Sequence, residues 1–199
     1  MIVAGLTGSI AMGKSETAKI FAGRGVPVFD SDAAVHQIYG RGGEAVEAIR
    51  AIAPTAIFDE CVNRQALAGL VQSDPALLKH IEGIVHPLVK RKQLSFLADA
   101  KARGAALAVL DIPLLFETGR ERDVDVVIVV STGAELQRQR ALARPGMTAE
   151  KLAFILSRQL PDDQKRARAD YVIDTSESIE STAHEVDRVI ACLTEKAKG

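Results

Sequence analysis

The sequence has few cysteines, no long apolar run and no excess of charge of either sign. Cys61 and Cys192 lie far apart and lack the paired spacing of a zinc site or a redox dithiol, so we expect two reduced thiols. The 25 basic and 26 acidic residues nearly cancel, which argues against nucleic acid or a membrane as a partner. The opening residues do not resemble a signal peptide, and no stretch is apolar enough to span a membrane. These absences predict a cytoplasmic protein whose partners are small molecules.

The apolar residues are grouped in short runs separated by helical patterns. With 199 residues, of which 47% are hydrophobic, the chain can bury one substantial core. Five runs indicate buried strands, because they are nearly continuous in apolar character instead of alternating. They are Ile2–Thr7, Val26–Asp30, Ala106–Ile112, Val126–Val130 and Tyr171–Asp174. Strands that alternate with helices predict a three-layer α/β fold with a five-stranded parallel sheet.

Two segments interrupt this alternation. The segment 34–103 shows helical patterns and no convincing strand, and Pro87 is expected to kink or end its helix there. The segment 132–168 is also helical in pattern, and its basic residues outnumber its acidic ones. We therefore predict a core made of 1–33 with 104–131 and 169–199, and two helical insertions, 34–103 and 132–168.

The residues from Gly8 to Ser15, Gly-Ser-Ile-Ala-Met-Gly-Lys-Ser, form a glycine-rich loop between an apolar strand and a helix. In this context the backbone N–H groups of such a loop wrap around phosphates, and the helix dipole adds to the attraction. Lys14 is expected to reach the β- and γ-phosphates of ATP, and the Ser15 hydroxyl to bind Mg²⁺. The candidate nucleotide-binding residues here are Gly8, Ala11, Met12, Gly13, Lys14, Ser15 and Glu16.

A phosphate-binding loop alone does not separate a kinase from a switch or a motor. The Asp-x-x-Gly and Asn-Lys-x-Asp motifs of guanine-nucleotide switches are missing from the sequence. A motor usually needs more chain, or a partner, to convert hydrolysis into work. We therefore expect a compact P-loop kinase with its own lid.

The basic segment 132–168 is the candidate lid. Arg140 and Arg144 are four residues apart, which places both guanidinium groups on one face of a helix, where they can reach phosphates. We expect this segment to close over bound ATP and exclude water. The alternative is a solvated basic surface without a role in binding.

Two carboxylates, Asp30 and Asp32, follow the second expected strand. Ligands of open α/β sheets bind at this carboxyl edge. Asp32 is expected to accept a proton from the attacking hydroxyl, or to hold that hydroxyl in line, and Asp30 to do the same or to order water around Mg²⁺. The alternative is that either residue caps the next helix.

The third expected strand ends at Asp111. This residue either lies in the outer coordination shell of Mg²⁺ or only caps the end of the strand. The apolar loop that follows, up to Glu117, is expected to line an acceptor pocket with Leu115 and Glu117. His86 stands directly before Pro87, and the sequence alone favours a structural role for it.

The chain closely resembles the dephospho-CoA kinase family over essentially its whole length. The resemblance rests on Leu6-Thr7-Gly8, Val28-Phe29-Asp30-Ser31-Asp32, Ile84-Val85-His86-Pro87-Leu88, Asp111-Ile112-Pro113-Leu114-Leu115-Phe116-Glu117, Gln139-Arg140, Arg144, Arg158-Gln159 and Arg168-Ala169-Asp170-Tyr171-Val172-Ile173-Asp174. It implies transfer of the γ-phosphoryl group of ATP, with Mg²⁺, to the 3′-hydroxyl of dephospho-CoA. Other kinases of small hydroxyl compounds and a non-catalytic ATP-binding module are the alternatives, and the oligomeric state stays open.

The same resemblance implies roles for individual residues. Asp32 matches the catalytic base and, with Ser15, the metal site. His86 matches a residue on the substrate side, and Arg140 and Arg144 match lid arginines. Segment 34–103 then corresponds to the helical CoA-binding domain and 132–168 to the lid.

The loop departs from the family pattern at Ser9, Ala11, Met12 and Glu16. A side chain at Ala11 or Met12 is harmless only where the backbone avoids positive φ. Glu16 places a carboxylate near the phosphates, where it either tunes affinity or turns to solvent.

Overall fold

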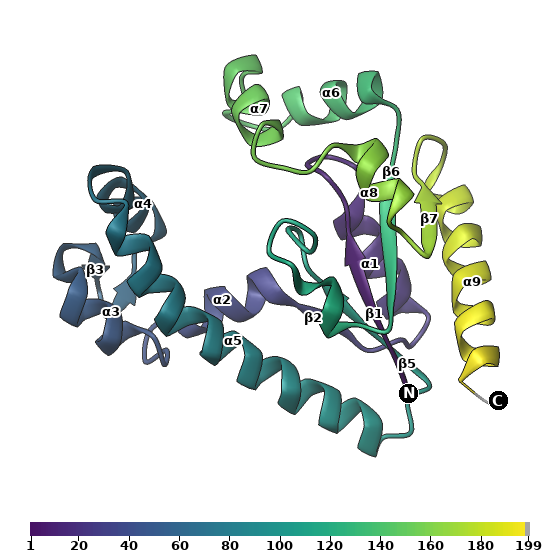
Figure 1. Ribbon diagram of the computed structural model, residues 1–199, viewed down its shortest axis with the longest axis horizontal. Coiled ribbons are helices and arrows are strands. Elements are labelled where there is room, and N and C mark those ends of the chain that lie inside the picture. Colours follow the sequence, from purple (N-terminus) through teal and green to yellow (C-terminus); the bar gives the residue numbers. More distant parts are fainter. Residues whose placement is uncertain (198–199) are drawn as a thin grey trace. The chain divides into compact units, whose positions relative to one another are not determined.

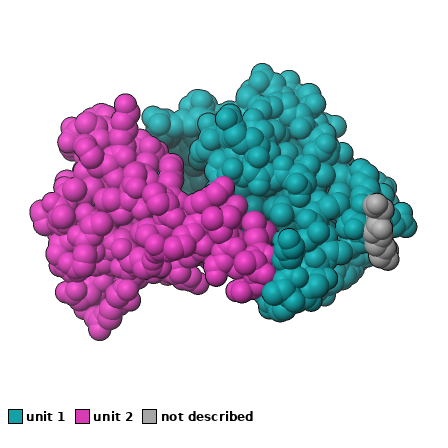
Figure 2. Space-filling model, turned by 60° about the horizontal axis from the view of Figure 1, so that its bottom comes forward, with its two compact units in different colours: residues 1–29, 100–199 teal, residues 30–99 magenta. Residues whose placement is uncertain are grey.

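The computed structural model describes residues 1–197 and divides the chain into two compact units, each described here by itself. Unit 1 contains residues 1–29 and resumes at Ala100, and unit 2 is Asp30–Asp99 (Figure 2). The predicted core segment 169–199 ends in residues 198 and 199, which lie outside the described residues. Within the described part of the chain, no helix is long and apolar enough to cross a membrane.

A five-stranded sheet in the order β2-β5-β1-β6-β7 organises unit 1 (Figure 1). The strands are β1 (Ile2–Thr7), β2 (Val28–Asp30), β5 (Leu107–Asp111), β6 (Val126–Ser131) and β7 (Tyr171–Asp174). β1 is parallel to β5 and β6, and β6 is parallel to β7. The register pairs Leu6 with Asp111, so β1 and β5 end at one edge. The predicted α/β fold with a five-stranded parallel sheet is confirmed.

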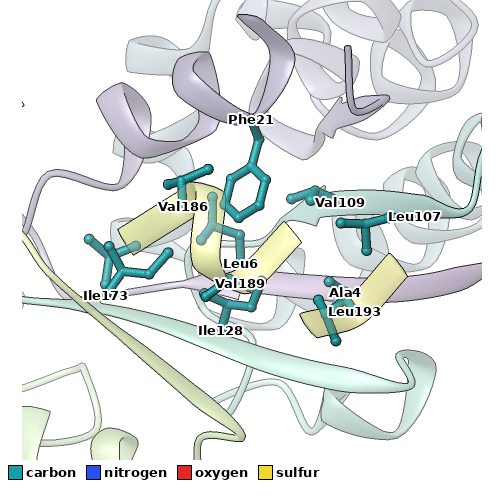
Figure 3. Packing of buried hydrophobic residues seen from close by; sticks show 11 residues of the cluster. Ala4, Leu6, Phe21, Leu107, Val109, Ile128, Ile173, Val186, Val189 and Leu193 are labelled. Carbon is teal, nitrogen blue, oxygen red and sulfur yellow. The ribbon is translucent and has the colours of Figure 1, made fainter. Parts of the chain in front are cut away.

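One face of the sheet is covered by α1 (Lys14–Gly23) and α9 (Ile179–Lys196). Phe21 of α1 and Val186, Val189 and Leu193 of α9 are buried among strand residues such as Leu6 (Figure 3). The α9 residues recur every three or four positions, which gives this helix one apolar face. Burial of each large side chain contributes roughly 1.5–3 kcal/mol. This core fixes the strand and the helix that flank the phosphate loop.

The loop that follows β5 crosses the opposite face of β1. A Cβ atom at Gly5 would lie 3.1 Å from Leu115 and 3.2 Å from Val124, so the loop approaches the strand closely enough that a side chain there would be crowded. Side chains alternate between the two faces of a strand, and Leu6, the next residue, points into the core with α1 and α9. Leu115 and Val124 therefore pack on the second face.

Three helices make up the segment 132–168. They are α6 (Ala134–Leu142), α7 (Ala149–Leu156) and α8 (Asp162–Ala167). The hydroxyl of Thr148 accepts a hydrogen bond from the N–H of Lys151 and so caps the start of α7. Helices α6 and α7 pack on each other, and α8 packs against β6.

Unit 2 is mainly helical. Its elements are α2 (Ser31–Tyr39), α3 (Val46–Ile52), the 3₁₀ turn Pro54–Ala56, β3 (Ile57–Phe58), β4 (Cys61–Val62), α4 (Arg64–Ser73) and α5 (Ala76–Ala102). The expectation that 34–103 holds no strand is wrong, because β3 and β4 form an antiparallel hairpin. Asp59 and Glu60 turn it with φ of 47° and 59°. Strands of two residues are too short to leave an apolar pattern.

Pro87 lies inside α5, so of the two expected outcomes, a kink or an end of the helix, the second does not occur. Proline removes one helical hydrogen bond and crowds the preceding turn. The opposing stripe of Ile81, Val85 and Val89 is buried, whereas Pro87 is exposed. Burial of this stripe along a helix of 27 residues outweighs the local loss.

Candidate active site

The phosphate loop connects β1 to α1 and requires glycine at two positions. A Cβ atom at Gly8 would lie 2.7 Å from the carbonyl oxygen of Val130. Gly13 has a φ of 90°, and a Cβ atom there would lie 3.0 Å from the Thr175 hydroxyl. Gly13 is also the N-cap of α1, and no side chain among residues 1–197 caps this helix. The first-turn N–H groups of α1 therefore remain available for an anion.

The backbone of Ala11 does not meet the condition for a harmless side chain, because its φ is 62°. The left-handed region costs a residue with a side chain about 1–2 kcal/mol. The methyl group of Ala11 is nearly buried and packs with Ala141 of α6 and Leu152 of α7. This packing offsets part of the strain and explains how the loop tolerates alanine at this position. Met12, in contrast, meets this condition, because it is not among the residues with positive φ.

Lys14 forms an ion pair with Asp111 at the end of β5. Both side chains are largely withdrawn from solvent, with 15% and 7% of their surface exposed. The pair arises because α1 begins, and β5 ends, at the edge of the sheet that the phosphate loop occupies. It places the Lys14 cation where the loop would hold phosphates, and it keeps both roles proposed for Asp111 open.

A cavity of about 280 Å³ lies beside the phosphate loop. Predicted residues of the phosphate loop line one side of the cavity, and predicted arginines of the basic segment line another. Its lining comprises Ala11, Gly13, Glu16, Ile20, Arg140, Arg144, Thr175, Glu177, Ser178, Ile179 and Thr182. The structure thus brings both predicted arginines to the same cavity as the loop.

Thr175 joins Arg140 to the loop and was missed by the sequence analysis. Arg140 donates from Nη2 to the Thr175 carbonyl oxygen (2.8 Å) and from Nη1 to its hydroxyl (3.3 Å). The Thr175 hydroxyl donates in turn to the carbonyl oxygen of Met12 (2.8 Å). The available signal was its position directly after β7, at the carboxyl edge of the sheet.

The Glu16 carboxylate lines the cavity and also forms a surface ion pair with Lys19 (2.7 Å). Both side chains are more than half exposed. An exposed pair one helical turn apart contributes little to stability. Its consequence here is electrostatic, because Lys19 partly offsets the negative charge that Glu16 brings near the phosphates.

The predicted acceptor residues Asp30, Asp32 and His86 belong to unit 2. The Asp30 carboxylate accepts a hydrogen bond from the N–H of Ala33 (2.9 Å) and caps α2, which was the alternative left open for it. Asp32 lies in the first turn of α2 and is exposed, and Arg64 donates to its carbonyl oxygen (3.4 Å). His86 lies on an exposed face of α5. Their catalytic and binding roles stay predictions.

The predicted pocket residues of the loop after β5, Leu115 and Glu117, are largely shielded from solvent. Leu115 is wholly buried and lies close to Gly5, and its role in an acceptor pocket stays a prediction. Glu117 lies 2.8 Å from the Nζ of Lys165 and accepts a hydrogen bond from the N–H of Leu160 (2.8 Å). Its carboxylate is therefore committed to the segment around α8. Lys165 gave no local signal, because its partner lies in the core segment 104–131, far away in the sequence.

Opposing effects set the acidity of Glu117. Desolvation by burial raises the pKa of Glu117, but the contact with Lys165 and the hydrogen bond from Leu160 outweigh it. The pKa of Glu117 therefore lies below its usual value, and the carboxylate stays ionised beside the buried lysine.

The donor groups fit a magnesium ion bound together with phosphates. Among the described residues, no group of three or more His, Cys, Asp or Glu side chains could hold an ion alone. Mg²⁺ is usually held by one or two protein oxygens and the substrate's phosphates, and it prefers hard oxygen ligands. The Ser15 hydroxyl is exposed in the first turn of α1 and meets this requirement.

A strand, a glycine-rich loop and a helix with an open N-terminus place Lys14 at the loop, beside a cavity that two arginines line. This arrangement is the phosphate-binding architecture of P-loop enzymes. The dephospho-CoA kinase family model matches residues 1–181. Dephospho-CoA kinase from Mesorhizobium japonicum is 54% identical over 190 residues, which cover 96% of this chain and 95% of the relative. That from Rhizobium etli is 51% identical over 200 residues, covering 100% and 98%.

The chain therefore belongs to the dephospho-CoA kinase family, as an ATP-dependent phosphotransferase. A Thermus thermophilus protein of known crystal structure shares 34% sequence identity with this chain. The two structures superpose with a TM-score of 0.85, over 96% of this chain and 97% of the other. Dephospho-CoA kinase from Campylobacter jejuni is 24% identical with a TM-score of 0.73, covering 98% of both chains. Shikimate kinase from Acinetobacter baumannii, at 18% identity and a TM-score of 0.52, covers 98% of this chain and 94% of its own and shares the fold alone.

Proposed function

We propose that this chain transfers the γ-phosphoryl group of ATP to the 3′-hydroxyl of dephospho-CoA and releases CoA and ADP. The observation that carries the proposal is the Lys14 cation, held by Asp111 at the open N-terminus of α1 beside a cavity bordered by Arg140 and Arg144. Membership of the dephospho-CoA kinase family supports the choice of acceptor.

The cavity accommodates the nucleotide in this proposal. Ile20 and Ile179 offer apolar surface to a planar base, and the Arg140 guanidinium can stack on it or reach the phosphates. The phosphates then extend to the N–H groups at the start of α1, where Lys14 exchanges Asp111 for phosphate oxygens. Arg140 and Arg144 add positive charge from the predicted lid.

Magnesium would be held by the Ser15 hydroxyl, by Asp32 in the proposed assignment, and by phosphate oxygens of ATP. When bound, the ion supplies positive charge that neutralises the phosphates during transfer. Asp111 remains a candidate for an outer-shell position, because its carboxylate lies at the same edge as Lys14.

On the acceptor side, the 3′-hydroxyl oxygen attacks the γ-phosphorus while the bond to the bridging oxygen of ADP breaks. Asp32 accepts the proton of this hydroxyl group as the new bond to phosphorus forms. The structure favours Asp32 over Asp30 for this step, because the Asp30 carboxylate is occupied as the cap of α2. We assign His86 to binding of dephospho-CoA. A cytoplasmic location belongs to the same proposal.

An acceptor panel tests the proposal. ADP release from ATP is measured with dephospho-CoA, with nucleosides, with other small hydroxyl compounds and without acceptor, with Lys14→Ala as the inactive control. Dephospho-CoA should stimulate release and the other compounds should not. Stimulation by another acceptor would assign a different kinase activity, and ATP binding without any stimulated release would indicate a non-catalytic module.

A further inference from the structure

The Ile10 peptide in the phosphate loop is held by two glutamine side chains from the basic segment. The N–H of Ile10 donates to Oε1 of Gln159 (3.0 Å), and the carbonyl oxygen of Ile10 accepts from Nε2 of Gln137 (2.9 Å). Gln137 lies in α6, and Gln159 lies three residues after the end of α7. The phosphate loop is thus hydrogen-bonded to both ends of the α6–α7 pair.

These two contacts supply partners that the local backbone does not. Ile10 lies between β1 and α1, outside the strand ladder and the helix that satisfy most buried peptide groups. The Gln137 side chain is buried, so water does not readily replace it. Loss of either glutamine would leave a peptide group of the loop without this partner, which is costly at a partly buried site.

Apolar packing and backbone strain coincide at the same point. Ile10 and Ala11 pack with Ala141 of α6 and with Leu152 and Leu156 of α7. Ala11, with its φ of 62°, is the strained residue of the loop.

The residues on both sides of Ala11 are held from outside the loop. The glutamines hold Ile10, and the Thr175 hydroxyl holds the Met12 carbonyl oxygen (2.8 Å). A strained conformation persists only where its surroundings fix it. The two glutamines therefore help to keep the loop in the shape that binds phosphates.

We propose that Gln137 and Gln159 are positioning residues that lock the Ile10 peptide of the phosphate loop to both ends of the α6–α7 pair, which couples ATP binding to that pair. The proposal rests on the proposed function only in that the loop binds ATP. Neither glutamine lines the cavity, so each acts through the loop. The coupling also runs in reverse, because ATP that orders the loop must order α6 and α7.

Methionine substitutions remove the bonds and keep the side-chain length. In Gln137→Met and Gln159→Met, the dissociation constant of the non-hydrolysable analogue β,γ-imido-ATP, measured by calorimetry, should rise by between about fivefold and a hundredfold. The KM for dephospho-CoA should change little. Gln139→Met is the matched control, because exposed Gln139 lies on the same helix and bonds only to Glu135 within the described contacts (3.1 Å). It should bind the analogue like the parent.

Glutamate substitutions provide a second pair of variants with the same added charge. A glutamate at 159 still accepts from the N–H of Ile10, whereas one at 137 cannot donate and turns a carboxylate towards the carbonyl oxygen. Gln137→Glu should therefore weaken analogue binding well beyond Gln159→Glu. Hydrogen exchange in α6 and α7 should slow on analogue binding in the parent and in Gln139→Met, and respond less in the two methionine variants.

Several outcomes overturn the inference. Parent-like affinity in both methionine variants does so, even if their melting temperatures fall, because that result indicates a structural role alone. Equal affinities of the two glutamate variants do so as well. Lys14→Ala separates this failure from failure of the proposed function: undiminished analogue binding in Lys14→Ala contradicts the phosphate-loop assignment, whereas weakened binding there with unaffected glutamine variants contradicts only the coupling.

Discussion

The Nζ of Lys165, wholly buried in α8, lies 2.8 Å from Oε1 of Glu117 in the loop after β5. Two segments far apart in the sequence are thereby joined through a buried ion pair, and the N–H of Leu160 donates to the same carboxylate oxygen. Next to this pair, Arg168 contacts Glu121 (2.6 Å) and lies over the ring of Phe116 (4.3 Å). The pair therefore connects α8, in the basic segment 132–168, to the loop that follows β5.

Removal of one partner of this pair should destabilise the protein strongly. Lys165→Met leaves the Glu117 charge shielded and unpaired, and we expect the free energy of unfolding to fall by about 3 kcal/mol or more. The double variant Lys165→Met with Glu117→Gln should recover part of this loss, because the amide oxygen still accepts from Leu160 and no charge remains. Denaturant unfolding measures both values. Equal destabilisation in the single and double variants would contradict the ion-pair interpretation.

The same pair predicts a pH dependence of stability. The pKa of Glu117 is lowered in the folded state from its ordinary value of 4.5. Its contribution to stability is therefore fully present above the ordinary pKa and is lost as the pH falls below it, through the lowered folded value. In Glu117→Gln, the free energy of unfolding should decrease less between pH 6 and pH 3 than in the parent. An identical decrease in both proteins would show that Glu117 does not contribute.

Much of the architecture was predictable because it depends on local sequence patterns, such as apolar runs and the glycine-rich loop. The buried runs Ile2–Thr7 and Tyr171–Asp174 are the strands β1 and β7, residue for residue. The glycine-rich loop joins β1 to α1 as expected, and the resemblance to the dephospho-CoA kinase family is confirmed by relatives that cover the whole chain. The catalytic role of Asp32 and the binding role of His86 remain predictions.

Features that depend on long-range contacts were not predictable. Gln159 and Ile10 are 149 residues apart in the sequence, and no periodic pattern connects them. The complete burial of Leu115 depends on the close approach of its loop to Gly5, more than 100 residues away in the sequence. The positive φ of Ala11 depends on helices that pack on its methyl group from another segment.

The two carboxylates that follow β2 should behave differently. Asp32→Asn keeps the shape of the side chain but removes the proton acceptor, so kcat should fall by about 100-fold or more with little change in ATP affinity. Asp30→Asn keeps an oxygen that can accept from Ala33 and should retain most of the kcat. Steady-state kinetics and nucleotide binding measure both. Near-normal kcat with weaker ATP binding in Asp32→Asn would make Asp32 a metal ligand only, and a loss confined to Asp30→Asn would move the base there.

Two arginines of α6 test the lid. Arg140 lines the cavity and contacts Thr175, whereas Arg138 is exposed on the same helix and does not line it. Arg140→Ala should lower kcat by at least about tenfold, because it removes donors that reach the phosphates, and Arg138→Ala should have little effect. Equal small effects of the two variants on kcat would contradict a catalytic lid.

Identification of the reaction product measures the proposed transfer to dephospho-CoA most directly. The parent enzyme is incubated with ATP, Mg²⁺ and dephospho-CoA, and the product is analysed by mass spectrometry and phosphorus NMR. We predict one added phosphoryl group on the 3′-oxygen of the ribose, formed in step with ADP. The 3′-deoxy analogue of dephospho-CoA should give no phosphorylated product, and Lys14→Ala should form the product about 100-fold more slowly or worse. A phosphoryl group at any other position, or phosphorylation of the 3′-deoxy analogue, would contradict the proposed function.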